Sequence, residues 1–381
     1  MKKKRALSQI QGPVRQRGDA DVLARAWERA SAKDPDFLTH GFHTWPARMH
    51  PAIARTVLSH SGAKTMVDPF CGGGTTLVEA RVAGAEAVGV DLSPLAIRVA
   101  DVKTQRRNRE ARGAFIKAAR RVAANSEERV RGRVKIHVDL PKPVLEWWDG
   151  HVIKELGGLR EEIGNVEGFE ERRALAMVFS SILTKVSKQR SETDRAQASR
   201  RIRKGLSTEL FLRRAKELAR RWDDFEKVAK GPPPRLMEGD ARGLQRLVGK
   251  RTFDLVLTSP PYGGTYDYAD HHARRMAWLD LDDSNLRRFE VGARRRMNHA
   301  NSRDVWEEEV DQMMRAMASV LSPDGAIVLV MGDGRAGGEI IRVPEQLQRI
   351  LPQYDLELSG VASQERHAGR EEHILLIRRS L

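Results

Sequence analysis

The sequence predicts an α/β fold: a Rossmann-like, doubly wound sheet, mostly parallel, with an antiparallel hairpin at its edge and a helical insertion. Short apolar segments alternate with segments of helical periodicity on both sides of the insertion. The insertion itself has only helical patterns, and the chain closes with two consecutive strand-like segments. Strands that alternate with helices are typical of a parallel sheet.

The elements before the insertion form a strand–helix repeat. Strands are expected at Thr65–Asp68 and Ala87–Asp91, each an apolar run that ends in an acid. Helices are expected at Thr75–Val82 and Pro94–Val102.

The same alternation resumes after the insertion. The expected elements are the strand Phe253–Leu257, the helix Val305–Leu321, the strand Ala326–Val330, the helix Pro344–Leu351, and the closing strands Asp355–Val361 and His373–Arg378. Residues 362–372 would join the last two strands as an antiparallel edge hairpin.

The positive charge of the chain is concentrated in the insertion. The 381 residues include 67 Lys and Arg against 52 Asp and Glu, a net charge of +15. Residues 101–235 alone hold 33 against 20, so +13 of that excess lies there. We therefore expect an N-terminal extension (1–35), one catalytic domain made of 36–104 and 236–381, and a basic helical insertion (105–235) that ends at Gly231–Pro234.

Lys185, Lys188 and Arg190 lie between helices of the insertion, among hydroxyl side chains. Such side chains suit phosphate oxygens. A solvated helical face is the alternative for an isolated charge run. The concentration of the charge in one segment, and a pI near 10.2, favour a nucleic-acid partner.

The single cysteine, Cys71, excludes an intramolecular disulfide and a Cys-rich zinc site. We expect a reducing, cytoplasmic location on this ground. No run of about 18 apolar residues occurs, so no membrane-spanning segment is expected.

A glycine loop follows the first strand. Gly72, Gly73 and Gly74 let the backbone turn sharply and approach a ligand closely. The spacings of dinucleotide-binding and phosphate-binding loops are absent. Asp91 and Asp240 also end strands, where carboxylates can accept hydrogen bonds from a ribose and from an adenine amino group. Any one of these acids alone is more often a helix N-cap or a turn residue.

Thr258–Tyr262 follows another strand directly, and its two prolines hold a rigid backbone. An ordinary proline-rich loop is the alternative. Ser259 as a hydrolase nucleophile is disfavoured, because no G-x-S-x-G elbow surrounds it.

Together, Asp68–Thr75 and Thr258–Tyr262 resemble the amino-group DNA methyltransferases that use S-adenosylmethionine. The resemblance covers roughly residues 40–104 and 236–381, and the segments Asp267–Tyr268, Leu286–Arg288 and Val291–Arg294 are similar to a bacterial branch. It implies a class I methyltransferase sheet with S-adenosylmethionine as cofactor.

The resemblance also implies roles for individual residues. Those holding the cofactor would be Thr44, Trp45, Pro46, Asp68, Pro69, Phe70, Gly72, Gly73, Gly74, Thr75, Asp91, Leu92, Asp240 and Ala241. The catalytic residues would be Ser259, Pro260, Pro261 and Tyr262. Ser259 and the Pro260 carbonyl would accept hydrogen bonds from the target amine, and Tyr262 would stack on a base extruded from the duplex.

Two other chemistries are disfavoured. Methylation at cytosine C5 needs a cysteine nucleophile, whereas Cys71 lies in the cofactor loop, so we interpret it as a small buried residue. His40, His43 and His50 match no helical metal-ligand spacing, so no metal is expected.

The predicted function is site-specific DNA methylation at an exocyclic amine. Cytosine N4 is preferred because the motif begins with Ser, where adenine-N6 enzymes of this kind more often carry Asp or Asn. The alternatives are adenine N6, an RNA guanine-N2 methyltransferase, and an inactive nucleic-acid-binding regulator. The partners would be double-stranded DNA and, as for some such enzymes, a restriction endonuclease. The DNA would be held by Lys185, Lys188, Arg190, Arg294, Arg295 and Arg296.

Overall fold

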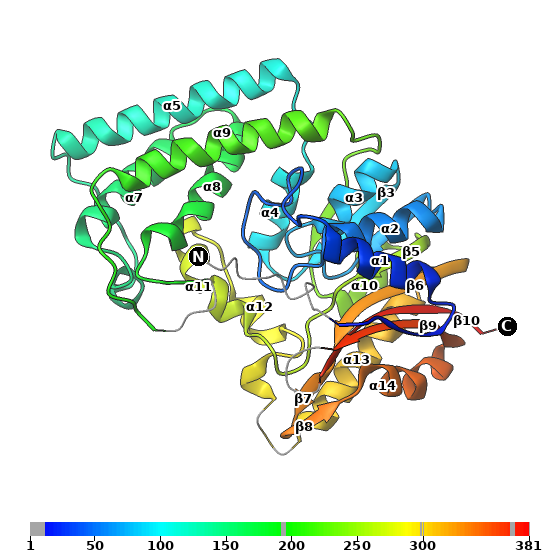
Figure 1. Ribbon diagram of the computed structural model, residues 1–381. Coiled ribbons are helices and arrows are strands. Elements are labelled where there is room, and N and C mark those ends of the chain that lie inside the picture. The colour runs from blue at the N-terminus through cyan, green and yellow to red at the C-terminus, as the bar shows by residue number, and fades with distance from the viewer. Residues whose placement is uncertain (1–11, 192–195, 298, 300, 366–369, 381) are drawn as a thin grey trace.

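The computed structural model describes residues 12–191, 196–297, 299, 301–365 and 370–380. A twisted sheet with helices on both faces forms one side of the molecule, and a layer of long helices forms the other (Figure 1). None of the described helices is long and apolar enough to cross a lipid bilayer.

One sheet of eight strands forms the centre of the fold. Its order is β1 (Arg15–Gly18), β9 (Leu356–Glu365), β10 (Glu371–Arg379), β6 (Leu321–Gly332), β5 (Phe253–Thr258), β2 (Thr65–Asp68), β3 (Glu86–Asp91) and β4 (Arg235–Glu238). The strands from β6 to β4 pair in parallel, whereas β10, β9 and β1 pair antiparallel. The predicted mostly parallel, Rossmann-like fold is therefore confirmed.

The closing hairpin forms, but it is not the edge of the sheet. β10 pairs with β6 and β9 pairs with β10, and β1 then adds outside β9 with Arg17 opposite Val361. Helix α1 (Asp21–Ala32) follows β1, and the buried indole of Trp27 donates to the Ala362 carbonyl at 3.1 Å. Part of the expected N-terminal extension thus belongs to the sheet and its helical cover.

Side chains of the central strands alternate between two apolar cores. In β5, Leu255 and Leu257 pack on one face and Val256 packs on the other. The first face is covered by α1, α2 (Pro51–Ser61) and α3 (Thr75–Ala83), and the second by α10 (Leu244–Val248), α13 (Ser302–Ala318) and α14 (Val343–Ile350). Burial of both faces explains why these strands are almost wholly apolar.

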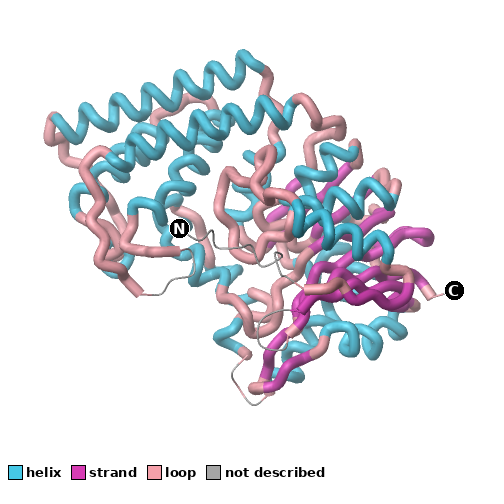
Figure 2. Tube along the Cα trace, in the orientation of Figure 1, coloured by secondary structure: helices cyan, strands magenta, loops and turns pink. Residues whose placement is uncertain are grey.

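In the sequence, the helical layer lies between α4 (Pro94–Thr104) and β4. It consists of α5 (Arg109–Arg131), α6 (Lys142–Leu145), α7 (Gly150–Gly164), α8 (Phe169–Leu183) and α9 (Leu206–Glu226). Figure 2 shows this layer as helices and loops beside the strands of the sheet.

The core of the helical layer extends into the catalytic part of the chain. It includes Val99 of α4 and both Met276 and Trp278 of α11 (Tyr268–Leu279). Two smaller features complete the fold, α12 (Ser284–Phe289) and a hairpin of β7 (Gly334–Ala336) and β8 (Glu339–Ile341). Because of the shared core, the insertion is packed as part of one molecule.

Candidate active site

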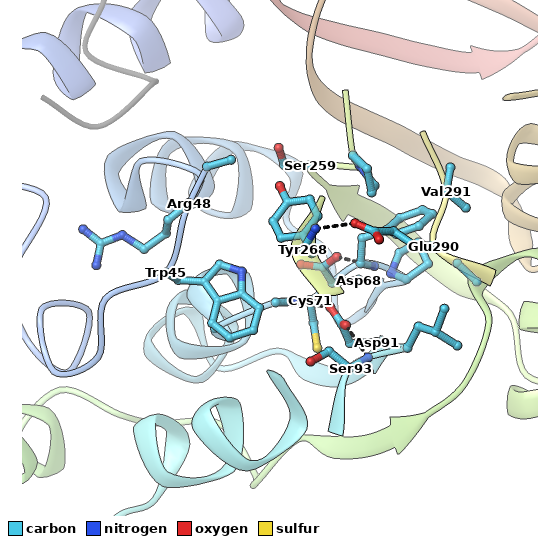
Figure 3. A pocket seen from close by; sticks show the side chains of 18 of the residues that line it. Trp45, Arg48, Asp68, Cys71, Asp91, Ser93, Ser259, Tyr268, Glu290 and Val291 are labelled. Atoms are coloured by element: carbon cyan, nitrogen blue, oxygen red, sulfur yellow. Dashed lines mark hydrogen bonds between the residues drawn. The ribbon is translucent and has the colours of Figure 1, made fainter. Parts of the chain in front are cut away.

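A cavity opens where the carboxyl ends of β2, β3 and β5 meet, the usual place for a ligand in a parallel sheet. Figure 3 shows Trp45, Asp68, Asp91, Ser259 and Glu290 around it. Most of the predicted cofactor residues line this cavity: Trp45, Pro46, Asp68, Pro69, Phe70, Gly72, Gly73, Thr75, Asp91, Leu92, Asp240 and Ala241.

Asp68 connects the cofactor loop to the strand that carries the catalytic motif. Its carboxylate accepts hydrogen bonds from the Thr258 hydroxyl at 2.5 Å, from the Phe70 N–H at 3.0 Å and from the Thr76 hydroxyl. Burial raises the pKa of Asp68 to about 6, although these donors oppose the shift. Asp68 therefore links the carboxyl end of β2 to the carboxyl end of β5.

Trp45 covers the glycine loop. A Cβ on Gly72, whose φ is +47°, would lie 2.9 Å from the indole nitrogen of Trp45, so only glycine fits there. Trp45 stacks on His272 of α11, with the ring centroids 4.4 Å apart. Trp45 thus contacts the glycine loop on one side and α11 on the other.

The end of β3 is tied to the same loop. The Asp91 carboxylate accepts from the Gly72 N–H and from the Ser93 N–H, both at 2.8 Å. Burial raises the pKa of Asp91 to about 6, and the nearby Asp68 carboxylate adds to the shift. Two carboxylates of raised pKa therefore face one cavity.

Asp240 has a partner that the sequence did not reveal. Arg242 donates to it, with Nη2 2.6 Å from Oδ2, and also donates to the Phe289 carbonyl at 3.0 Å. Asp240 still lines the cavity, and its side chain is 32% exposed.

Two predicted cofactor residues lie outside the cavity lining. Thr44 is exposed, and its carbonyl contacts the His43 ring at 3.0 Å. Gly74, at φ +77°, lets α3 approach α4, because a Cβ there would lie 2.9 Å from the Cα of Ala100. Gly74 serves helix packing in this structure.

Two of the four predicted catalytic residues line the cavity, and two lie outside its lining. Ser259 and Pro261 line the cavity, whereas Pro260 is buried behind it. Tyr262 is also buried, and its hydroxyl donates to Glu372 at 2.6 Å. Its ring packs in the apolar core on the face covered by α10, α13 and α14, outside the cavity lining, and the stacking of Tyr262 on a base stays a prediction.

Sequence reasoning missed the wall made by α11, α12 and the residues after α12. Tyr268, Leu286, Phe289, Glu290 and Val291 all line the cavity. Tyr268, Leu286 and Val291 lie in segments that resemble a bacterial branch in sequence, but that resemblance gave them no role, and no sequence feature marked Phe289 or Glu290.

Glu290 is the charged member of this missed wall. Its side chain is buried, accepts from the Tyr268 N–H, and pairs with Arg295 at 2.5 Å. Burial raises the pKa of Glu290, and Arg295 opposes the shift. Figure 3 shows its bond to Tyr268 beside Ser259.

The six predicted DNA-binding cations lie outside the cavity. Arg190 is exposed, whereas Lys185 is partly buried, and burial lowers its pKa to about 8. Lys188 donates to the Glu146 carbonyl at 2.9 Å.

The arginine run after α12 is paired with carboxylates. Arg294 lies 3.5 Å from Asp267, Arg295 pairs with Glu290, and Arg296 lies 2.7 Å from Glu309. Whether any of these cations contacts DNA stays a prediction.

Cys71 and the histidines take structural positions. Cys71 is buried, and burial raises the pKa of its thiol well above the ordinary range. His40 contacts Glu79 at 2.7 Å, and His43 contacts the Ser180 hydroxyl at 2.9 Å. In the described part of the chain, no three His, Cys, Asp or Glu residues are grouped as metal ligands.

Comparison with known proteins finds similarity around the glycine loop. Residues 42–133 match the model of the RMKL-like methyltransferase domain family. The chain is 27% identical over 273 residues to the type II methyltransferase M.MvaI of Kocuria varians, across 64% of this chain and 58% of that protein. It is 23% identical over 266 residues to the type II methyltransferase M.BsoBI of Geobacillus stearothermophilus, across 60% and 49% of the two chains.

The chain thus spans about half the length of these relatives. Among solved structures, TrmN from Thermus thermophilus aligns at 14% identity with a TM-score of 0.34, across 94% of this chain and 53% of that one.

Proposed function

We propose that the chain is an S-adenosylmethionine-dependent methyltransferase that methylates an exocyclic amine in DNA, with cytosine N4 as the preferred target. The observation that carries the proposal is that one cavity is lined by two predicted motifs. Asp68–Gly73 and Thr75 come from the cofactor loop, and Ser259 and Pro261 come from the catalytic motif. A cofactor and an acceptor base would therefore meet in one place.

The cavity walls suit the cofactor. The Asp91 carboxylate would accept from the ribose hydroxyls, and Asp240 would accept from the adenine amino group. The glycine loop and Trp45 would surround the methionine moiety. When bound, the cofactor supplies an electrophilic methyl group.

Ser259 carries the catalytic part of the proposal. An exocyclic amine is a poor nucleophile, because its lone pair is delocalised into the ring. The Ser259 hydroxyl and the Pro260 carbonyl would accept its two N–H bonds and orient the lone pair for in-line attack. Tyr268, which lines the cavity, replaces Tyr262 in our account as the aromatic face for the extruded base.

The helical insertion would hold the DNA through phosphate contacts. Helices α5 and α9 carry exposed cations. These are Arg109, Lys117 and Arg120 on α5, and Arg213, Lys216 and Arg220 on α9. A shallow groove between these helices is lined by Arg109, Lys117 and Arg120 of α5 and by Ala219 of α9. We infer that these cations supply the salt-dependent part of binding.

The substrate class is tested with labelled S-adenosylmethionine and two acceptors, duplex DNA and tRNA. We expect label in DNA, and we expect none with the Ser259→Ala variant. Label in tRNA alone would favour an RNA methyltransferase. A wild-type chain that binds nucleic acid without transferring label to either acceptor would favour an inactive regulator.

A further inference from the structure

A buried amine lies beside the glycine loop without a partner. Lys103 of α4 is 0% exposed, and its Nζ makes no hydrogen bond within the described residues. That nitrogen is 3.6 Å from the position that a Cβ on Gly73 would occupy, and Gly73 lines the cavity. A buried ammonium without a counter-charge is costly, so a carboxylate brought beside this nitrogen would stabilise its charged form.

The neighbouring cations are already neutralised. Arg48 pairs with Asp36 at 2.9 Å, and Arg221 pairs with Glu217 at 2.9 Å. Figure 3 shows the guanidinium of Arg48 turned away from the cavity. Lys103 has no such carboxylate within hydrogen-bond reach in the described part of the chain. Burial and the charge of Arg48 lower the pKa of Lys103 well below its ordinary value, whereas the Asp36 charge opposes this.

The cavity offers carboxylates, and Arg48, the cation within its described lining, already pairs with Asp36. Asp68 and Asp91 suit hydroxyl or ammonium donors, and both lie at strand ends. The methionine moiety of S-adenosylmethionine carries an ammonium and a carboxylate together. Its carboxylate therefore needs a positive partner near the glycine loop, and the flexible four-carbon side chain of Lys103 can supply one.

We propose that Lys103 binds the carboxylate of the methionine moiety of S-adenosylmethionine beside Gly73. This inference rests on the proposed function, because it takes S-adenosylmethionine as the ligand. It adds a cofactor-binding residue that no sequence motif marks, on a helix that also packs against the insertion.

Calorimetric titration of the full chain tests the inference with two ligands that differ in one group. The ligands are S-adenosylmethionine and decarboxylated S-adenosylmethionine. For Lys103→Met we expect the affinity for the first to fall at least about tenfold, the loss of one charge-assisted hydrogen bond. The affinity for the decarboxylated ligand should stay unchanged, which also shows that the variant is folded.

Lys154→Met is the matched control, because Lys154 is exposed on α7. Its affinities for both ligands should equal those of the wild type. Equal weakening of both ligands by Lys103→Met, or no change for either, would overturn the inference while the proposed function stands. A wild-type chain that binds neither ligand would overturn the proposed function, and this inference with it.

Discussion

The Thr258 hydroxyl donates to the buried Asp68 carboxylate at 2.5 Å and thereby joins the catalytic strand to the cofactor loop. The two residues are 190 positions apart, with the whole helical insertion between them. Both motifs are thus held in one register by the sheet and by this bond, since Met66 and Val67 of β2 pair with Leu255 and Val256 of β5.

Thr258→Val should lower the free energy of unfolding by about 1–3 kcal/mol, because it leaves a buried carboxylate with one donor fewer. Denaturant unfolding measures the change. Thr265→Val is the control: its partly exposed hydroxyl donates to the Gly263 carbonyl at 3.5 Å, so a loss of at most about 0.5 kcal/mol is expected. Equal losses for the two variants would contradict a structural role for the Asp68 bond.

Cofactor affinity should fall as the pH drops through about 6. Asp68 and Asp91 both have a pKa of about 6, so their carboxylates are ionised above that pH and become neutral below it. A neutral carboxyl is a poorer acceptor for ribose hydroxyls. Titrations between pH 5 and pH 8 measure the effect, and Asp91→Asn should flatten part of the profile. An unchanged profile in that variant would remove Asp91 from the ribose site.

The same two groups have the opposite effect on folding. Their pKa in the folded chain is raised from 3.8, so the folded state binds more protons than the unfolded state between pH 3.8 and about 6. Their stabilising contribution is therefore present at low pH and is lost as the pH rises through this window.

The two tyrosines of the catalytic segment should behave differently. Tyr268→Ala removes an aromatic wall of the cavity, so kcat/KM for DNA should fall by a factor that corresponds to roughly 1–3 kcal/mol of lost stacking. Tyr262→Phe loses the bond to Glu372 and should mainly lower stability, by about 1 kcal/mol. A loss of turnover in Tyr262→Phe with unchanged stability would restore Tyr262 to the active site.

Cations on α5 should dominate the salt dependence of DNA binding. Lys117→Ala and Arg120→Ala should each reduce the slope of log K against log[salt] by about 1. Arg294→Ala should reduce it less, because Asp267 lies 3.5 Å from that guanidinium. Fluorescence anisotropy at several salt concentrations measures the slopes, and a steeper loss in Arg294→Ala would place the contact surface at the arginine run instead.

Much of the sheet could be predicted because apolar strands and helices alternate regularly around Thr65–Asp68 and Phe253–Leu257. The edge strand β1 could not, because Arg15–Gly18 has no apolar alternation and is exposed throughout. Its pairing with β9 depends on the backbone and on the packing of Trp27.

The candidate site was predictable where a residue type follows a strand end, as at Asp68, Asp91 and Ser259. The directions in which side chains point, and the partners of the charged groups, could not be predicted. Tyr262 and Tyr268 are six positions apart, and only the turn between β5 and α11 decides that the second lines the cavity. Likewise, Arg295 pairs with Glu290, five positions earlier, whereas the Lys103 amine makes no hydrogen bond within the described residues, and composition could not show this difference.

Nucleoside analysis of duplex DNA after incubation with the wild-type chain and S-adenosylmethionine shows which base is methylated. We expect N4-methylcytosine with the wild type and none with Ser259→Ala, whose affinity for the cofactor should stay the same. N6-methyladenine as the only product would contradict the assignment of the base. Undiminished methylation by Ser259→Ala would contradict the site itself.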